Sequence, residues 1–362
     1  MTKILQIIPT SPNNADGIGD YALQLATQLR QDFQVDTQFL VFRNDMQVES
    51  SVSGFVMQQL SIHTAEHFCA AIPDGIQAII VHFSAYPYFN SSLKGSLGVG
   101  TPFWFVDALR SVVTSGQIKL VVMFHELPKL YWKQFYVFDF LNPIQCIVSR
   151  RLAQMADTVL TSSTRFQSVL SKWIGKDVAK LSIFSSMGEP EVIIPLRARQ
   201  RRVIVFGGSA RARIYNNHSP ALIQSCQLLG IDEIYDIGST LNLPNYTHAG
   251  IDLRSIGFRS PVEISELLST SLAGCIDYSP FPGNLGKSSV FAAYCAHGLV
   301  PILTRYNPSE VDDLYNDRHY LVLGSELAIL NLNRLQIVAD TAHQWYVGHT
   351  TKSIAKTFFS YL

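Results

Sequence analysis

Short apolar runs alternate with amphipathic stretches along the whole sequence, and this alternation limits the possible folds more than any other feature. Ala78–Phe83 (AIIVHF) and Lys119–Phe124 (KLVVMF) are nearly continuous apolar runs of strand length, as expected for strands that are covered on both faces. Residues 101–113, between them, have helical spacing and open with Thr101-Pro102, which suits a helix start. Alternating strands and helices build parallel sheets, so we expect an α/β fold of doubly wound sheets.

The same alternation occurs twice, on either side of a segment that lacks it. Ser185–Arg202 (SSMGEPEVIIPLRARQRR) carries a glycine, two prolines and four arginines, which favours a domain boundary. We expect domains at residues 1–185 and 203–340, and a terminal helix at 341–362 that packs on the first domain. Further strands are expected at Lys3–Ile8, Val35–Phe42, Val159–Thr161, Val203–Phe206, Glu233–Ile237, Gly274–Ile276 and Val300–Thr304, and further helices after Gly19 and Ser163 and at Thr64–Ile72, Pro220–Leu229, Pro261–Leu268 and Val290–His297.

Composition excludes several classes of protein. The 362 residues are 47% hydrophobic and 15% charged, which excludes a disordered or fibrous chain. Lys plus Arg and Asp plus Glu both number 28, and this zero balance argues against a dedicated nucleic-acid binder. No apolar stretch is long enough to span a membrane, and the five scattered cysteines contain no CxxC pair. We therefore expect a cytoplasmic protein with reduced thiols.

Two candidate sites lie in the first half of the sequence. Gly17 and Gly19 belong to a glycine loop between a strand and a helix, where freed amides can receive an anion or a sugar hydroxyl; a plain tight turn explains the loop about as well. His125 and Glu126 follow a buried strand, where a histidine can bind substrate or transfer a proton. A structural histidine is the alternative there, and for His82 we favour a structural role.

The second half of the sequence holds two candidate anion sites. GGSARAR combines close-approach glycines with two arginines that suit a diphosphate; a surface turn or interdomain salt bridges are the alternatives. GNLGKSS precedes an apolar helix whose first amides, with a lysine, could hold a phosphate, while ordinary capping is the alternative. The spacing does not fit a Walker A loop. The candidate residues are Gly208, Ser209, Arg211 and Arg213 in the first motif and Asn284, Gly286, Lys287, Ser288 and Ser289 in the second.

Taken in order, these segments resemble the GT-B glycosyltransferases, within the retaining, nucleotide-sugar-dependent, family 4-like group. The resemblance covers most of the chain, and its motifs are individually loose but correctly ordered. Its segments are DGIGDYALQLA, VVMFHELP, ADTVLTSSTRFQSVL (Ala156–Leu170), VIVFGGSAR, Arg254–Leu303 with its "AxGxPV"-like end, and the terminal SIAKTFFSYL.

The resemblance implies two facing Rossmann-like domains, a nucleoside-diphosphate-sugar donor in the C-terminal one, a hydroxyl acceptor in the N-terminal one, and no metal. It implies that His125 contacts the transferred sugar, that Arg211 or Arg213 faces the diphosphate, and that Phe258 lies near the base. Gly17 and Gly19 would line the acceptor side or the donor phosphates, and Gly286, Lys287, Ser288 and Ser289 would hold the phosphates. His125, Arg211 and Lys287 are thus the expected catalytic residues.

The sequence departs from the family at one point. The family places two glutamates, seven residues apart, around the segment that here reads Asn284–Tyr294, yet no Glu or Asp occurs between Asp277 and Glu310.

The expected function is that of a hexosyltransferase. One alternative is a non-catalytic GT-B module that binds nucleotide or glycan or partners an active transferase, and another is a sugar-nucleotide epimerase of similar architecture. Peripheral membrane contact is compatible with the sequence, which does not indicate an oligomeric state.

Overall fold

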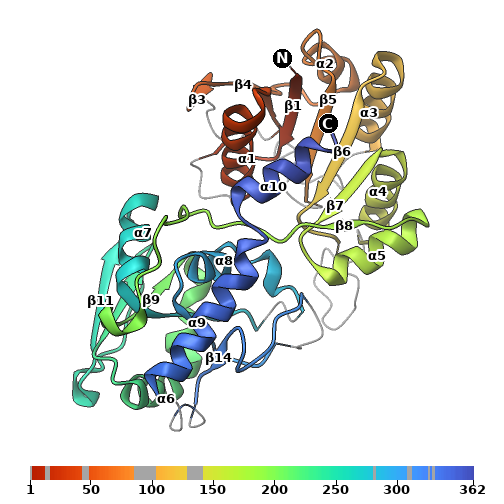
Figure 1. Cartoon of the computed structure of the whole chain (residues 1–362). Coiled ribbons are helices and arrows are strands. Elements are labelled where there is room, and N and C mark those ends of the chain that lie inside the picture. Colours follow the sequence, from red (N-terminus) through yellow and green to blue (C-terminus); the bar gives the residue numbers. More distant parts are fainter. Residues whose placement is uncertain are drawn as a thin grey trace. The chain divides into compact units, whose positions relative to one another are not determined.

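The chain divides into two compact units. The computed structural model describes residues 2–12, 17–42, 49–84, 103–128, 142–279, 283–307, 312–324, 327 and 331–362. Unit 1 comprises residues 1–181 together with 351–362, and unit 2 comprises residues 182–350 (Figure 1). The expected helix start at Thr101-Pro102 and the loop residue Asp16 lie outside the described residues.

Unit 1 is built on a sheet with strand order β3-β4-β2-β1-β5-β6-β7-β8. Its strand pairs are parallel apart from the antiparallel hairpin of β3 and β4 at one edge. The strands are β1 (Lys3–Ile8), β2 (Asp36–Val41), β3 (Ser51–Val52), β4 (Phe55–Gln59), β5 (Ala78–Phe83), β6 (Lys119–Phe124), β7 (Thr158–Thr161) and β8 (Ala179–Lys180).

Helices cover both faces of the unit 1 sheet. One face carries α1 and α10, which contact each other, and the other carries α2, α3 and α4 (Figure 1). Phe33 of α1 stacks on Phe359 of α10 with ring centroids 4.3 Å apart. The helices are α1 (Gly17–Phe33), α2 (Ala65–Ala70), α3 (Phe103–Gly116), α4 (Asn142–Met155), α5 (Thr164–Ile174) and α10 (Thr351–Phe359).

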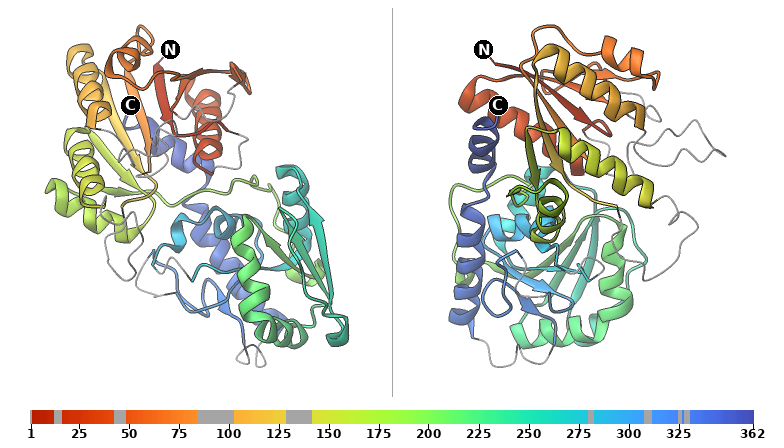
Figure 2. Two further views of the ribbon diagram at one scale, coloured as in Figure 1. Left: turned by 180° about the vertical axis from the view of Figure 1, so that it is seen from behind. Right: turned by 90° about the vertical axis from the view of Figure 1, so that its right-hand side faces the viewer.

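Unit 2 has a second sheet, in the order β11-β10-β9-β12-β13-β14, and all its pairs are parallel. The right-hand view of Figure 2 shows α6 and α9 on opposite faces of this sheet. The strands are β9 (Gln200–Phe206), β10 (Glu233–Ile237), β11 (Asp252–Gly257), β12 (Ser271–Ile276), β13 (Val300–Leu303) and β14 (Leu321–Val322). The helices are α6 (Ala212–Leu229), α7 (Pro261–Thr270), α8 (Ser289–Ala296) and α9 (Leu332–Val347), with short 3-10 turns η2 (Leu196–Ala198), η3 (Ser209–Arg211), η4 (Thr247–Ala249) and η5 (Leu285–Lys287).

The prediction of two doubly wound α/β domains is confirmed, while some boundaries differ. The arginine-rich segment 186–202 belongs to unit 2, which begins at Ser182. Residues 341–350 are not part of a terminal helix on the first domain, because α9 continues to Val347 within unit 2 and only α10 returns to unit 1. Pro220 lies inside α6, which begins eight residues before the expected start. Across the described ranges, no helix has the length and apolarity that crossing a membrane requires.

Candidate functional site

A small pocket opens in unit 2 at the carboxyl ends of β9 and β12, which are neighbours in the sheet. Carboxyl ends of parallel strands are where ligands bind in open α/β sheets. The cavity measures about 260 Å³ and brings together both motifs of the second half of the sequence. It is lined by Gly208, Ala210, Arg211, Arg213, Ile214, Ile276, Asp277, Tyr278, Lys287, Ser288, Ser289 and Val290.

Arg213 is held in this pocket by an acidic residue at the end of β12. Its Nε donates to Asp277 Oδ2 at 2.6 Å, and its side chain is 37% exposed. No hydrogen bond of its two Nη groups is recorded within the described ranges, so their donors can serve a ligand. Arg213 thus combines a position held by Asp277 with Nη groups that could donate to the oxygen atoms of a ligand.

Asp277 is buried and heavily hydrogen-bonded. Its Oδ1 accepts from Thr304 Oγ1 at 2.7 Å and from the Ser279 amide at 3.1 Å. Burial alone would raise the pKa of this carboxyl, but the hydrogen bonds from Ser279, Arg213 and Thr304 outweigh burial and lower the pKa from 3.8 to about 2. Asp277 is therefore a carboxylate whose role is to orient Arg213.

The start of α8 supplies amides and a lysine to the same pocket. Ser288 caps the helix, its side chain accepting from the Phe291 amide at 3.2 Å. The amides of Ser289 and Val290, the first two helical residues, have no recorded partner in the described chain, as is usual for a first turn. Lys287 lines the pocket beside them. A helix start with an adjacent lysine attracts an anion.

Arg211 does not have the predicted diphosphate-facing geometry. Its guanidinium forms a bidentate pair with Asp236, Nε and Nη2 each 2.9 Å from a carboxylate oxygen, and Asp236 is fully buried. Nη1 donates to the carbonyls of Gly207 and Gly208, and Nη2 donates to that of Ser239. Because these bonds use every donor of the group, Arg211 stabilises the loop after β9 instead of presenting donors to a ligand.

The loop before α8 also uses most of its amides internally. The Gly286 amide donates to Asp312 Oδ2 at 3.0 Å, and the Lys287 and Ser288 amides donate to the carbonyls of Asn284 and Leu285. A Cβ at Gly286 would lie 3.1 Å from Asp312 Cγ, so the glycine serves close packing. These amides therefore do not match the expectation that this loop's backbone holds phosphate, which leaves Ser289 and Val290.

Of the remaining predicted donor-side residues, only some line the pocket. Gly208 lines it, whereas Ser209 is exposed on η3 and is not among the lining residues. Asn284 is buried, and its Oδ1 has no hydrogen-bond partner within the described chain. Phe258 is 74% exposed just after β11 and does not line the pocket. Of the predicted residues, the structure thus brings together Gly208, Arg211, Arg213, Lys287, Ser288 and Ser289 in this pocket, but not Ser209, Asn284, Gly286 or Phe258.

In unit 1, His125 lies at the corresponding edge of the other sheet. It is the first residue after β6, it is buried, and its amide donates to the Phe83 carbonyl at 2.9 Å. Its Nε2 lies 3.1 Å from Nδ1 of His82, in β5. Glu126 Oε2 accepts from Ser84 Oγ at 3.2 Å. His125 is thus held by its strand, its neighbour and its backbone.

The two glycines of the first loop differ in their surroundings. Gly17 is exposed, and a Cβ there would meet nothing within 4 Å. Gly19 lies against the chain after β1, where a Cβ would approach Pro12 N and Thr10 O to 2.9 Å. Close approach of two backbone segments, which only glycine permits, is therefore the observed role of Gly19.

The sequence analysis assigns no role to Gln6 or Asp277 and only a structural role to His82. Asp277 is an acid at the end of a buried strand, and that placement is a signal for a positioned partner. Gln6 and His82 are polar positions inside apolar strands, and that anomaly was the available signal. Their partners are 76 and 43 residues away in sequence, so only the fold identifies them.

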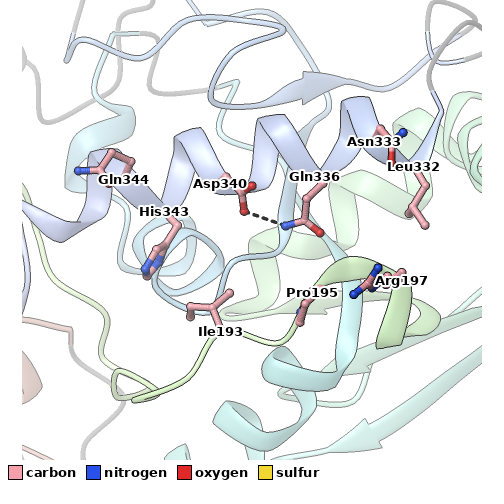
Figure 3. Close-up of a pocket in the computed structure, with 9 residues that line it drawn as sticks. All are labelled: Ile193, Pro195, Arg197, Leu332, Asn333, Gln336, Asp340, His343 and Gln344. Atoms are coloured by element: carbon pink, nitrogen blue, oxygen red, sulfur yellow. Dashed lines mark hydrogen bonds between the residues drawn. The ribbon is translucent and has the colours of Figure 1, made fainter.

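A second cavity in unit 2, of about 600 Å³, contains none of the predicted residues (Figure 3). It lies between the segment Ile193–Arg197 and α9. Gln336 is bonded on both sides, accepting from the Leu196 amide at 2.8 Å and donating to Asp340 at 2.7 Å. The bond from the Leu196 amide to Gln336 therefore joins the segment Ile193–Arg197 to α9. Among described residues, no group of three or more His, Cys, Asp or Glu side chains could hold a metal ion.

Comparison with known proteins identifies the fold. No protein-family model matches the chain, and no curated protein matches it. Solved structures match over its whole length: a sucrose-phosphate synthase from Thermosynechococcus elongatus (10% identity, TM-score 0.66, covering 99% of this chain and 98% of that one) and HepE from Anabaena in complex with UDP (12%, 0.62, 99% of each). An alpha-glucosyltransferase in complex with UDP also matches (10% identity, TM-score 0.60, 100% of both chains). These neighbours are GT-B glycosyltransferases, and this chain has the GT-B fold.

Proposed function

We propose that the protein is a glycosyltransferase of the hexosyltransferase class, which moves a sugar from a nucleoside-diphosphate sugar to a hydroxyl acceptor. The observation that carries this proposal is the pocket of unit 2, where Arg213, Lys287 and the start of α8 meet. These groups are two cations and the first amides of a helix, and a diphosphate is a ligand that they suit. Neighbouring structures of the same fold were solved with UDP, so UDP is the first nucleotide to test.

The proposed chemistry is stabilisation of the leaving group. When the bond between the sugar and the diphosphate breaks, negative charge develops on the diphosphate oxygens. Arg213 is already oriented by Asp277, so its charge needs no reorganisation at that moment. Lys287 and the first amides of α8 add to the same field. His125 in unit 1 is proposed to contact the transferred sugar. The groups named here require no metal, and the five free cysteines suit a reducing, cytoplasmic compartment.

The main alternative is a module that binds a nucleotide or glycan without turning it over. The carboxylate available in the donor pocket is that of Asp277, and Arg213, Thr304 and Ser279 already occupy it. The segment that carries two glutamates in the resembling family has none here. Nucleotide binding without transfer is the outcome that would favour this alternative.

Two measurements on the wild-type protein separate these functions. A thermal-shift screen of nucleoside diphosphates and their sugars identifies the donor, because a ligand that binds only the folded state raises the Tm. Product analysis with each stabilising sugar nucleotide, with and without hydroxyl acceptors, then distinguishes transfer from binding. Stabilisation by a nucleotide sugar followed by transfer supports the proposal. Binding without turnover for any donor supports the module, and a changed sugar nucleotide without acceptor indicates an epimerase. No stabilisation by any nucleotide would overturn the diphosphate site itself.

A further inference from the structure

Three polar side chains form a hydrogen-bonded line across three adjacent strands of unit 1. Gln6 lies in β1, His82 in β5 and His125 just after β6, and these strands are neighbours in the sheet. Gln6 Oε1 is 2.7 Å from His82 Nε2, and His82 Nδ1 is 3.1 Å from His125 Nε2. Both ring nitrogens of His82 are therefore engaged, and the line runs from the interior of the sheet to its carboxyl edge.

The inner part of this line is fully buried. Gln6 and His82 have 0% exposure. Burying a polar group costs folding free energy unless the group is hydrogen-bonded. Burial lowers the pKa of His82 to about 3, so its imidazole is neutral at physiological pH. A neutral imidazole has one N–H group and one acceptor nitrogen. Its two bonds must therefore have opposite directions.

The direction of each bond follows from the first one. In the structure the Gln6 amide turns its Oε1 toward His82, and because this oxygen can only accept, His82 Nε2–H donates to it. His82 Nδ1 then carries the lone pair and accepts from Nε2–H of His125. In neutral His125 the Nδ1 atom is consequently the acceptor. Gln6 thus determines, through His82, which nitrogen of His125 carries the proton.

The orientation of the two rings is fixed as well. They stack with centroids 5.3 Å apart and an angle of 23° between their planes. Tyr21 of α1 packs edge-on against both, at 5.8 Å from His82 and 5.1 Å from His125. Rotation of the His125 ring would break its bond to His82 and clash with this packing.

We propose that Gln6 and His82 are positioning residues that hold His125 in the Nε2–H tautomer, with Nδ1 as the atom that accepts a hydrogen bond. The effect of this tautomer on catalysis rests on the proposed function, in which His125 contacts the transferred sugar. The tautomer does not depend on that function. A merely structural role for His82 would require only that it fill space and stabilise the sheet.

Two substitutions at His82 separate positioning from packing. His82→Leu fills most of the space but offers no acceptor to His125. His82→Asn can place its Oδ1 where Nδ1 was and still accept from His125 Nε2–H. If His82→Leu does not fold, Gln6→Leu acts one bond further away by removing the acceptor that fixes the proton on His82. Circular dichroism and urea unfolding establish which variants are folded.

Nitrogen-15 NMR of histidine-labelled protein reads the tautomer directly, with His125→Ala used to assign the signals. We expect Nε2 of wild-type His125 to be protonated and Nδ1 unprotonated. His82→Leu and Gln6→Leu should give a mixture of tautomers, and His82→Asn should restore the wild-type pattern. A wild-type His125 protonated on Nδ1 or averaged between both nitrogens would overturn the proposal. So would an unchanged tautomer in folded His82→Leu.

Kinetics then tests the catalytic consequence. We expect kcat to fall roughly 10- to 100-fold in His82→Leu, the scale seen when the outer partner of a metal-bound histidine is removed, with a smaller change in KM and recovery in His82→Asn. Equal losses in His82→Leu and His82→Asn would indicate packing alone and overturn positioning. If wild type shows no turnover with any donor, the proposed function fails, while the NMR result still decides whether the tautomer is held.

Discussion

Arg213 Nε donates to Asp277 Oδ2 at 2.6 Å, which joins the first turn of α6 to the end of β12. Two residues earlier, Arg211 makes a similar ion pair with Asp236 at 2.9 Å, entirely inside the protein. The two arginines of one motif therefore have different roles. Arg213 is partly exposed in the pocket, where we propose that it binds the diphosphate, and Arg211 secures the loop after β9.

The first prediction concerns pH and Asp277. A folded-state pKa of about 2 lies below the ordinary 3.8, so the carboxylate stabilises the fold above pH 4 and loses this contribution as pH falls through 2. The shift corresponds to about 2 kcal/mol. Urea unfolding of wild type and Asp277→Asn should show a difference that is full at pH 6 and about half as large at pH 3. A difference in unfolding free energy that did not change with pH would contradict this prediction. Asp74→Asn, at an exposed position, is the control for the change in net charge.

The second prediction is that Arg211→Ala loses stability and not nucleotide affinity. Removing the guanidinium leaves Asp236 buried and unpaired, which costs about 3–5 kcal/mol. Arg211→Lys should recover only part of this, because an ammonium cannot form the bidentate pair. Urea unfolding measures the loss, and calorimetry under conditions where the variant is folded measures UDP affinity. If the Arg211→Ala variant were as stable as wild type but bound UDP more weakly, the prediction would be wrong and Arg211 would be a ligand-binding residue.

The third prediction concerns Lys287 at the start of α8. If its ammonium neutralises a diphosphate, Lys287→Ala should weaken UDP binding by about 1–3 kcal/mol, the scale of a lost charged hydrogen bond. Arg197→Ala is the matched control, since Arg197 is an exposed cation of the same unit that lines the other cavity. Isothermal titration calorimetry gives both affinities. Equal affinities for the Lys287 variant and wild type would remove this residue from the site.

The fourth prediction separates the two glycines of the first loop. Gly19→Ala would push a methyl group against Pro12 N and Thr10 O at 2.9 Å, and overpacking of this kind costs about 1–3 kcal/mol. Gly17→Ala meets open space and should leave the free energy of unfolding nearly unchanged or slightly higher. Urea unfolding of both variants tests the contrast. Equal free energies of unfolding for the two variants would contradict this prediction, because they would mean that the chain after β1 moves aside for the added methyl group at little cost.

Much of the fold follows from the sequence because buried parallel strands are continuous apolar runs. β5 and β6 were predicted to the residue for this reason. The start of α6 was misplaced because Pro220 resembles a first-turn proline, whereas it lies inside the helix. The sequence analysis does not predict the hairpin of β3 and β4, because strands of two and five residues carry too little pattern.

The candidate site was less predictable, and the two arginines show why. Arg211 and Arg213 share one motif, and nothing local distinguishes their environments. The difference comes from their partners: Asp236, 25 residues after Arg211, forms a buried bidentate pair with it, whereas Asp277, 64 residues after Arg213, bonds only its Nε. The same holds for Gly286, whose amide is taken by Asp312 from a distant loop. Residues of both motifs line one pocket at the carboxyl edge of the sheet, and tertiary partners determine the hydrogen bonds of each side chain there.

The return of α10 to unit 1 affects how the protein is made. Its inward residues Ile354, Ala355 and Phe358 are buried, and Phe359 stacks on Phe33 of α1. Synthesis proceeds from the N-terminus, so every residue of unit 2 leaves the ribosome before α10 does. A nascent chain can therefore complete the second unit while the outer side of α1 is still bare. Completion of the first unit therefore waits until the whole of unit 2 has been synthesised.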